Sequence, residues 1–210
     1  GEPAYLPMDE KHPINPLHPY GKNKVAIEKI LKDKANADPA WKVICLRYFN
    51  PVAAHPSGII GEDPKGIPNN LFPFITQVAI GKRKFIQVFG NDWNTKDGTG
   101  VRDYIHVMDL AEGHIASVKY LLSIDSGYEI INLGSGKGYS VLEVINEFKL
   151  TSGCNIEHRI VSRRPGDIEK TVADISKAEL TLDWKPNKTL KQICVDGWNW
   201  QKNNPEGYVD

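Results

Sequence analysis

The segment Val43-Ile44-Cys45-Leu46-Arg47-Tyr48-Phe49-Asn50-Pro51 decides the fold class of this 210-residue chain. Its first four residues form a continuous apolar run, which is typical of a parallel strand buried on both faces. Pro51 has no N–H to donate, so we expect the strand to stop there. Residues 20–34, which precede the strand, have apolar side chains at helical spacing. These are Ala26, Ile27, Ile30 and Leu31. A helix followed by a buried strand predicts an α/β fold.

The alternation of helices and strands continues along the chain. Periodicity predicts helices over 70–80 and 108–122, and strands over 85–89 and 128–133. Capping boxes, in which a hydroxyl N-cap precedes an acid or amide by three residues, predict three further helix starts. They are Ser140 with Glu143, Ser176 with Glu179, and Thr189 with Gln192. Residues 51–69 contain four prolines and three glycines and predict a long loop of the kind that usually carries function.

The composition argues against several classes of partner. Twenty-six basic residues balance twenty-six acidic ones, so we expect neither nucleic acid nor an anionic membrane surface as a partner. The chain has no run of eighteen apolar residues and no signal-peptide pattern. Its cysteines, Cys45, Cys154 and Cys194, are not at C-x-x-C spacing, and free thiols predict the reducing cytoplasm. The six histidines lack H-x-x-x-H spacing, so we expect no metal site.

A phenol and an ammonium lie four residues apart in the predicted helix, at Tyr20 and Lys24. At this spacing the two side chains share one helical face. The positive charge favours the phenolate form of Tyr20. A tyrosinate can take a proton from an alcohol while a hydride leaves the same carbon. For this pair taken alone, an exposed tyrosine beside a solvated lysine is the favoured interpretation.

Hydride chemistry needs a dinucleotide cofactor, whose site combines a strand, a G-x-G-x-x-G turn and a helix. The glycine-rich candidate is Gly134-Ser135-Gly136-Lys137-Gly138, between a predicted strand and the Ser140 helix. Its spacing is G-x-G-x-G, and no acidic residue ends a second strand about twenty residues later. A structural strand-to-helix turn is therefore favoured over a cofactor loop.

Seven ordered motifs cover essentially the whole chain. They are Pro19–Lys24, Leu46–Pro51, Ala54–Gly58, Ile67–Leu71, Asp97–His106, Asn132–Gly134 and Arg163–Asp167. Together they resemble the UDP-glucose 4-epimerase family, which belongs to the extended short-chain dehydrogenases/reductases. The resemblance is far more specific than the Tyr20–Lys24 pair by itself.

This resemblance implies a division of the chain. Residues 1–50 would be the C-terminal portion of an NAD-binding Rossmann domain, whose glycine-fingerprint half and catalytic serine or threonine would lie before Gly1. Residues 51–210 would form a smaller mixed α/β lobe that binds a UDP-sugar. The strand and helix near 101–122 are candidates to return to the Rossmann domain.

The resemblance also assigns roles at the cofactor end of the site. Tyr20 would exchange a proton with the sugar 4-hydroxyl, and Lys24 would hold the nicotinamide ribose. Phe49 would line the nicotinamide side. Asn50 would hydrogen-bond the substrate, although an asparagine before proline is also a common turn former.

Further positions would bind the nucleotide. Asn70 and Leu71 open a helix whose N-terminus suits a phosphate, the alternative being simple N-capping by the asparagine. Gln87 and Phe89 lie two apart on a strand and would face the uracil, although a phenylalanine there could belong to the core.

Two arginines are the expected diphosphate ligands. Arg102 and Arg164 have guanidinium groups that match phosphate geometry, although each could be a surface ion-pair partner. Asp167 would accept from a ribose hydroxyl. Thr171 aligns with the position beside the sugar 2-substituent, where the resemblance associates tyrosine with exclusion of N-acetylated sugars. A small threonine predicts a pocket that admits both kinds of sugar.

The expected function is NAD-dependent interconversion of UDP-galactose and UDP-glucose by transient oxidation at C4, in galactose metabolism. UDP-GalNAc and UDP-GlcNAc are expected as further substrates, and a homodimer as the assembly. The 210-residue chain alone is expected to be inactive. Two alternatives stay open: a related nucleotide-sugar dehydratase or decarboxylase, and a non-catalytic fragment that only binds UDP-sugar or dimerises.

Overall fold

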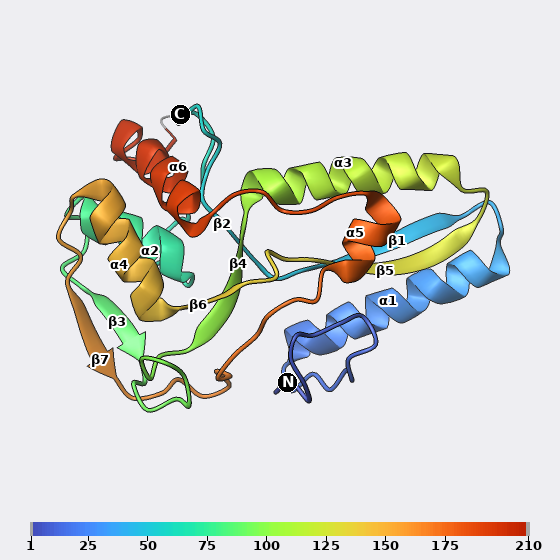
Figure 1. Ribbon diagram of the computed structural model, residues 1–210, viewed down its shortest axis with the longest axis horizontal. Coiled ribbons are helices and arrows are strands. Elements are labelled where there is room, and N and C mark those ends of the chain that lie inside the picture. Colours follow the sequence, from blue (N-terminus) through green and yellow to red (C-terminus); the bar gives the residue numbers. More distant parts are fainter. Residues whose placement is uncertain (1, 209–210) are drawn as a thin grey trace.

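The apolar run at 43–46 lies in strand β1 (Lys42–Tyr48), which pairs in parallel with β5 (Gly127–Leu133). Helix α1 (Pro19–Ala37) covers one face of this two-stranded sheet, and α3 (Val107–Ser123) and α5 (Ser176–Leu182) cover the other (Figure 1). The structure is a computed structural model and describes residues 2–208. Its parallel sheet between helical layers confirms the predicted α/β fold.

The other part of the molecule, on the left in Figure 1, contains the remaining strands and helices. β4 pairs in parallel with β2 and antiparallel with β6, and β3 pairs in parallel with β7. Helices α2, α4 and α6 pack on one another beside these strands. The elements are β2 (Asn50–Val52), α2 (Leu71–Ala79), β3 (Ile86–Phe89), β4 (Val101–His106), β6 (Gly138–Ser140), α4 (Val141–Ser152), β7 (His158–Val161) and α6 (Leu190–Asn203).

Strand β4 connects two hydrophobic cores. Tyr104 belongs to the core that contains Phe72 and Phe148, between β4 and helices α2, α4 and α6. The next residue, Ile105, belongs to the core that contains Ile131, beneath α3 and α5. Successive side chains of a strand point to opposite faces, so one strand serves both cores.

The elements that follow residue 50 do not all lie with the predicted lobe. β5, α3 and α5 pack against β1 and one another, and α3 continues directly from β4. The segment near 101–122 thus runs from the second part of the molecule to the β1–β5 sheet (Figure 1).

Strand β1 ends at Tyr48, before Pro51, but Pro51 does not stop strand formation as we expected. The chain continues from β1 into β2, which contains Pro51. β2 is an edge strand whose neighbour is β4. An edge position tolerates proline because the missing N–H does not interrupt a ladder on the open side.

The three predicted capping boxes have different outcomes. The Ser140 box is complete: its Oγ accepts from Glu143 N at 3.0 Å, and Glu143 returns a bond to Ser140 N. Thr189 also caps its helix, but the Gln192 side chain bonds Asp196 instead. The Ser176 box is wrong, because the N-cap position is Ile175 and the carboxylate of Asp174 accepts from Ser176 N.

Helix α1 begins at Pro19 as expected, yet the apolar face predicted for it is not buried. None of the residues of α1 is buried, and the side chain of Ile30 is 66% exposed. Contacts with β1 and β5 hold the helix on the sheet. The residues at 20–34 therefore predict the helix correctly but not its packing.

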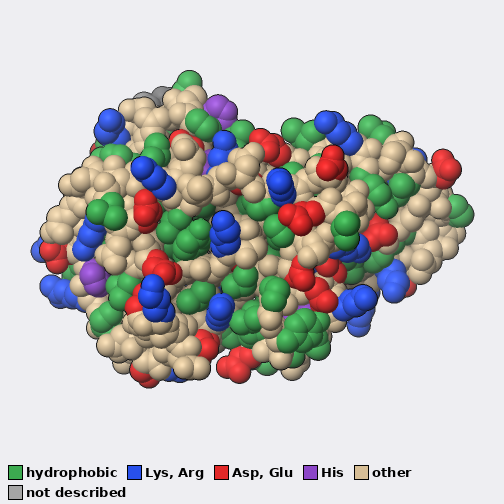
Figure 2. All heavy atoms as spheres, viewed as in Figure 1, with side chains coloured by type: hydrophobic (Ala, Val, Ile, Leu, Met, Phe, Trp, Pro, Cys, Tyr) green, Lys and Arg blue, Asp and Glu red, His purple; other side chains and the backbone are tan. Residues whose placement is uncertain are grey.

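The distribution of surface charges and the state of the cysteines agree with the expectations from the composition. Positive and negative side chains are interspersed on the face shown in Figure 2 rather than gathered in one patch. Cys45, Cys154 and Cys194 are free thiols. Within residues 2–208, no helix is long and apolar enough to cross a membrane, and no cluster of three potential metal ligands occurs.

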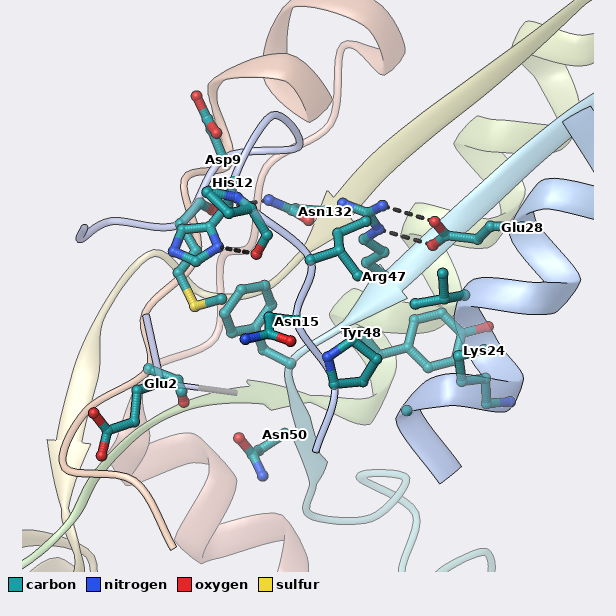
Figure 3. A pocket seen from close by; sticks show the side chains of 18 residues that line it. Glu2, Asp9, His12, Asn15, Lys24, Glu28, Arg47, Tyr48, Asn50 and Asn132 are labelled. Atoms are coloured by element: carbon teal, nitrogen blue, oxygen red, sulfur yellow. Dashed lines mark hydrogen bonds and ion pairs between the residues drawn. The ribbon is translucent and has the colours of Figure 1, made fainter. Parts of the chain in front are cut away.

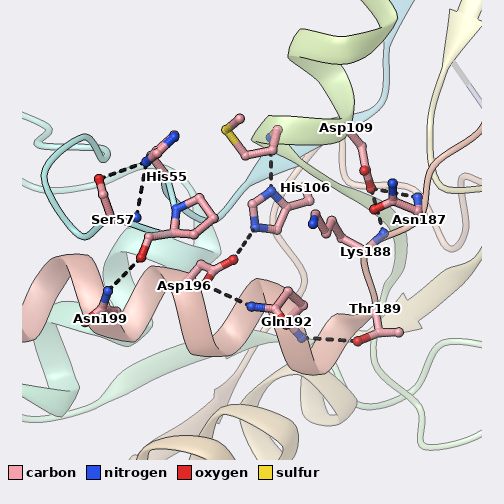
Figure 4. A network of polar contacts seen from close by, with 12 residues as sticks. His55, Ser57, His106, Asp109, Asn187, Lys188, Thr189, Gln192, Asp196 and Asn199 are labelled. Atoms are coloured by element: carbon pink, nitrogen blue, oxygen red, sulfur yellow. Dashed lines mark hydrogen bonds and ion pairs between the residues drawn. The ribbon is translucent and has the colours of Figure 1, made fainter.

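A buried polar pair fixes the junction between β4 and α3 (Figure 4). His106 Nδ1 accepts from Met108 N at 3.0 Å, which leaves Nε2 to donate to Asp196 Oδ2 on α6 at 3.1 Å. The other oxygen of Asp196 accepts from Gln192. The His106 ring is 1% exposed, and this burial lowers its pKa although Asp196 opposes the effect. The imidazole is therefore held neutral.

We predict an acid-sensitive stability from His106. Its pKa is lowered in the folded state, so the unfolded chain binds the proton more readily, and the free energy of unfolding should fall as pH drops below about 6.5. Denaturant titrations from pH 8 to pH 5 should show a shallower pH slope for His106→Gln. The exposed His18→Gln is the matched control. An unchanged slope for His106→Gln would contradict the assignment.

Candidate functional site

A cavity of about 410 Å³ lies between α1, the end of β1 and the N-terminal segment, and we call it the α1 cavity (Figure 3). Its lining includes four of the predicted residues: Lys24, Phe49, Asn50 and Thr171. They come from α1, from the turn between β1 and β2, and from the segment before α5. The carboxyl end of a parallel strand is the usual ligand edge of an α/β sheet.

A second cavity, of about 390 Å³, lies between α2, β3 and β4, and we call it the α2 cavity. Eight of the predicted residues line it: Asn50, Asn70, Leu71, Gln87, Phe89, Arg102, Arg164 and Asp167. Asn50 lines both cavities, because it lies where the chain leaves β1 and enters β2. The fold thus brings the predicted residues into two adjoining spaces.

Tyr20 is the one predicted residue that lines neither cavity. It lies in the first turn of α1 and is 74% exposed. Lys24 Nζ lies 5.2 Å from the centroid of the Tyr20 ring. The helix therefore places the phenol and the ammonium side by side, with the ammonium at the rim of the α1 cavity.

Arg102 is a partly buried cation that faces the α2 cavity. Its Nη1 donates to the carbonyl oxygen of Val101 at 2.8 Å, and no carboxylate within residues 2–208 lies at salt-bridge distance. Burial lowers the pKa of its guanidinium, the nearby Asp167 carboxylate opposes this effect, and Arg164 adds repulsion. A partly desolvated cation without a direct ion pair is costly, so this side of the cavity is suited to an anion.

Arg164 is paired, unlike Arg102. Its Nε and Nη2 donate to Asp167 Oδ1 at 3.2 and 2.8 Å, and its guanidinium lies 5.2 Å from the Phe89 ring. The ion-pair alternative is therefore realised in this structure. Exposed ion pairs contribute at most about 1 kcal/mol, so a diphosphate could compete for this guanidinium.

The N-terminus of α2 supplies further donors to the α2 cavity. Asn70 is the N-cap residue, but its side chain makes no capping bond and instead donates to Glu62 Oε1 at 3.5 Å. Simple N-capping by the Asn70 side chain is thus not what the structure contains. The first backbone N–H groups of a helix without such a cap favour anions.

The glycine-rich turn at 134–138 is structural. The buried carboxylate of Asp103 accepts from Ser135 N at 2.6 Å, from Gly136 N at 3.0 Å and from Ala173 N at 3.1 Å. These N–H groups already bind an anionic side chain, so the turn is not available to a dinucleotide phosphate. A Cβ on Gly134 would lie 2.6 Å from Ala173, which explains the glycine.

Many residues that line the two cavities were not predicted as site residues, and Trp93 and Asn132 are two of them. Trp93 lines the α2 cavity, where its Nε1 donates to Phe89 O and its ring stacks on Arg163 at 3.8 Å. Asn132 lines the α1 cavity, and its Nδ2 donates to Met8 O at 2.9 Å. The position of Asn132 at the end of a predicted strand was a usable signal, whereas Trp93 lies in a loop without periodicity.

Comparison with known proteins identifies the family. The family model described as GDP-mannose 4,6 dehydratase matches residues 1–196. The chain belongs to the GDP-mannose 4,6 dehydratase family.

Curated relatives that are similar to this chain carry the name UDP-glucose 4-epimerase. The protein from Yersinia enterocolitica is 56% identical over 209 residues, and the one from Dictyostelium discoideum is 53% identical over 210 residues. These alignments cover 99% and 100% of this chain and 61% of each relative. The chain thus spans less than two thirds of the curated relatives that it matches.

Solved structures show the same fold. The structure of UDP-glucose 4-epimerase from Bifidobacterium longum, in complex with NAD⁺ and UDP, has a TM-score of 0.94 and 50% sequence identity. The match covers 99% of this chain and 62% of that one.

We predict that Arg102→Met weakens the binding of UDP to this chain by roughly tenfold to a hundredfold, because a hydrogen bond to a charged group is worth about 1.5–3 kcal/mol. Calorimetric titration with UDP measures the effect. Arg159→Met is the control, since Arg159 stacks on Phe85 at 4.0 Å and does not line the α2 cavity. Equal losses in both variants would exclude a specific anion site at Arg102.

Proposed function

We propose that the full-length protein to which this chain belongs interconverts UDP-galactose and UDP-glucose, with NAD as its cofactor, in galactose metabolism. The observation that carries the proposal is Arg102, a cation that makes no salt bridge to a carboxylate among residues 2–208 and lines a cavity that meets the Lys24 cavity at Asn50. The family description names a dehydratase. The relatives from Dictyostelium discoideum and Yersinia enterocolitica, which are 53% and 56% identical to this chain, are named epimerases, and this supports epimerisation over dehydration.

Each side chain has a role in this reaction. Tyr20, as tyrosinate, accepts the proton of the sugar 4-hydroxyl and later returns it, while Lys24 stabilises the phenolate. Arg102 and Arg164 bind the diphosphate. Binding energy from this remote group keeps the 4-keto sugar in the protein while it turns to present its other face. Asn50, between the two cavities, hydrogen-bonds the sugar.

The residues of the α1 cavity fit the nicotinamide end of NAD. Lys24 offers an ammonium for ribose hydroxyls, and Phe49 offers an apolar surface. When bound, NAD supplies the acceptor and donor of hydride at sugar C4. The pyrophosphate needs a donor-rich loop that the 134–138 turn does not provide, because Asp103 occupies its N–H groups.

The nucleotide would occupy the α2 cavity. Gln87 and Phe89 line it beside Arg164 and would contact the uracil. Asp167 would accept from a ribose hydroxyl once a diphosphate draws Arg164 away. Asn70 and Leu71 would present the α2 N-terminus to a phosphate.

Domain organisation, assembly and compartment belong to the same proposal. Residues 1–50 are the tail of the NAD-binding domain. The elements α3, β5 and α5 pack with this tail and belong to the same domain, and the rest of 51–210 is the UDP-sugar lobe.

The exposed Ile27 and Ile30 on α1 support a homodimer through this helix. Free cysteines support a cytoplasmic enzyme.

The decisive experiment supplies UDP-galactose to the purified full-length protein and follows the sugar nucleotides by chromatography. We predict UDP-glucose as the product, and a loss of roughly 10²–10⁴-fold in kcat for Tyr20→Phe, since that is the usual contribution of a general acid–base residue. The 210-residue chain alone should show no turnover. A product that has lost water would indicate a dehydratase and reject the proposal. No conversion of UDP-galactose, together with release of carbon dioxide from UDP-glucuronic acid, would indicate a decarboxylase and reject it as well.

Thr171 predicts the sugar range. It lines the α1 cavity with Lys24, Phe49 and Asn50, and a small side chain there leaves room for an acetamido group. The full-length protein should epimerise UDP-GalNAc as well as UDP-galactose. Thr171→Tyr should lower kcat/KM for UDP-GalNAc by roughly tenfold or more, because overpacking typically costs about 1–3 kcal/mol. Thr171→Ser is the control, and equal kcat/KM changes for both sugars would contradict the prediction.

A further inference from the structure

Lys24 and Glu28 are four residues apart on α1, at the spacing that lets a lysine and a carboxylate pair along a helix. The same helix contains such a pair, since Lys34 Nζ lies 3.0 Å from Asp38 Oδ2. Lys24 instead lies beside the Tyr20 ring, and Glu28 is bound elsewhere. The difference between the two pairs is the presence of an arginine next to Glu28.

Arg47 on β1 holds both oxygens of the Glu28 carboxylate (Figure 3). Its Nε donates to Oε1 at 2.8 Å and its Nη2 donates to Oε2 at 2.7 Å. The two side chains are only 22% and 19% exposed, so water screens this pair less than a surface pair. Two parallel bonds from one guanidinium give a fixed geometry that a lysine cannot reproduce.

This contact also fixes the position of α1. The helix has no buried residue, so its register on the sheet rests on a few specific contacts. Arg47 Nη1 donates to Glu10 O at 3.2 Å, and Tyr128 on β5 donates to the backbone oxygen of Glu28 at 3.1 Å. Lys24 lies one turn before Glu28 and on the same face, so the clamp sets where its ammonium lies.

We propose that Arg47 is a positioning residue for the proposed reaction: it holds the Glu28 carboxylate away from Lys24 and so leaves the ammonium beside the Tyr20 phenol. Without Arg47, the half-buried carboxylate would take Lys24 as its counter-ion. The phenolate would then lose its cation and gain a nearby negative charge. Only the catalytic consequence rests on the proposed function, whereas the charge arrangement concerns this chain alone.

Several titratable groups surround the cluster on every packed element. They are Tyr20, Lys24 and Glu28 on α1, Cys45 and Arg47 on β1, Tyr128 on β5, and Glu10 in the N-terminal segment. Burial raises the pKa of Cys45, which keeps this thiol neutral at physiological pH. The charges that change in the experiment below are those of Arg47 and Glu28.

The first experiment is an ultraviolet titration of phenolate in this chain, in which the Tyr20 signal is the difference between each variant and the same variant with Tyr20→Phe. In Arg47→Gln, the midpoint of that signal should move to higher pH, because a carboxylate would then take the ammonium that lies beside the phenol. In the double variant Glu28→Gln/Arg47→Gln the midpoint should return to the parent value. Asp38→Asn, which removes the exposed pair on the same helix, is the control.

The double variant separates the proposal from a structural role. If Arg47 merely holds the helix in place, removing Glu28 as well restores nothing, and that result overturns the proposal. Arg47→Lys provides a second test if Arg47→Gln does not fold, as judged by circular dichroism. It retains a charge but not the fork, so the midpoint should move in the same direction by a smaller amount. No movement in a folded variant also overturns the proposal.

The second experiment measures the pH profile of kcat/KM in the full-length protein with UDP-galactose. The acid limb should move to higher pH in Arg47→Gln and return in the double variant. If the protein has no epimerase activity but the phenolate midpoints move as expected, the proposed function fails while the role of Arg47 stands. Activity with phenolate midpoints that do not move rejects the role of Arg47 and leaves the function intact.

Discussion

Strand β4 sends successive side chains to opposite faces, and both parts of the molecule are built on that alternation. Arg102, Tyr104 and His106 face the α2 cavity, the first core and helix α6. Asp103 and Ile105 face the 134–138 turn and the second core. A strand has a side-chain period of two, so a slip of one residue would exchange the two sets. Apolar burial on both faces therefore fixes where Arg102 can lie.

The electrostatics of the site follow from this placement. Asp103 is buried with N–H donors around it, while Arg102, one residue earlier, is only partly buried and makes no salt bridge to a carboxylate among residues 2–208. The fold thus satisfies the anion of Asp103 internally but supplies no direct ion-pair partner for Arg102. This asymmetry makes the α2 cavity suited to an anion, and Asn50 connects that cavity with the one beside Lys24.

Local patterns predicted the elements well where the signal was strong. The helix over 108–122 and the strand over 128–133 match α3 and β5 to within one residue at each end. The failures have physical reasons. Pro51 is tolerated because β2 is an edge strand, and Ser176 loses its capping role because the carboxylate of Asp174 reaches the helix first. The spacing of residues in the sequence shows neither whether a strand lies at the edge of a sheet nor which of two side chains caps a helix.

The sequence by itself determined the α/β class, the helical pairing of Tyr20 with Lys24, and the residue types needed for an anion. These depend on short-range periodicity and on chemistry that each side chain carries anywhere. Only the tertiary structure decided which cation is free. Arg102, Arg164 and Arg47 have the same guanidinium, yet among residues 2–208 Arg102 makes no salt bridge, Arg164 pairs with Asp167, and Arg47 clamps Glu28. Asp167 is three residues from Arg164, but Glu28 and Glu10 lie 19 and 37 residues before Arg47, so long-range packing decides the partners of Arg47.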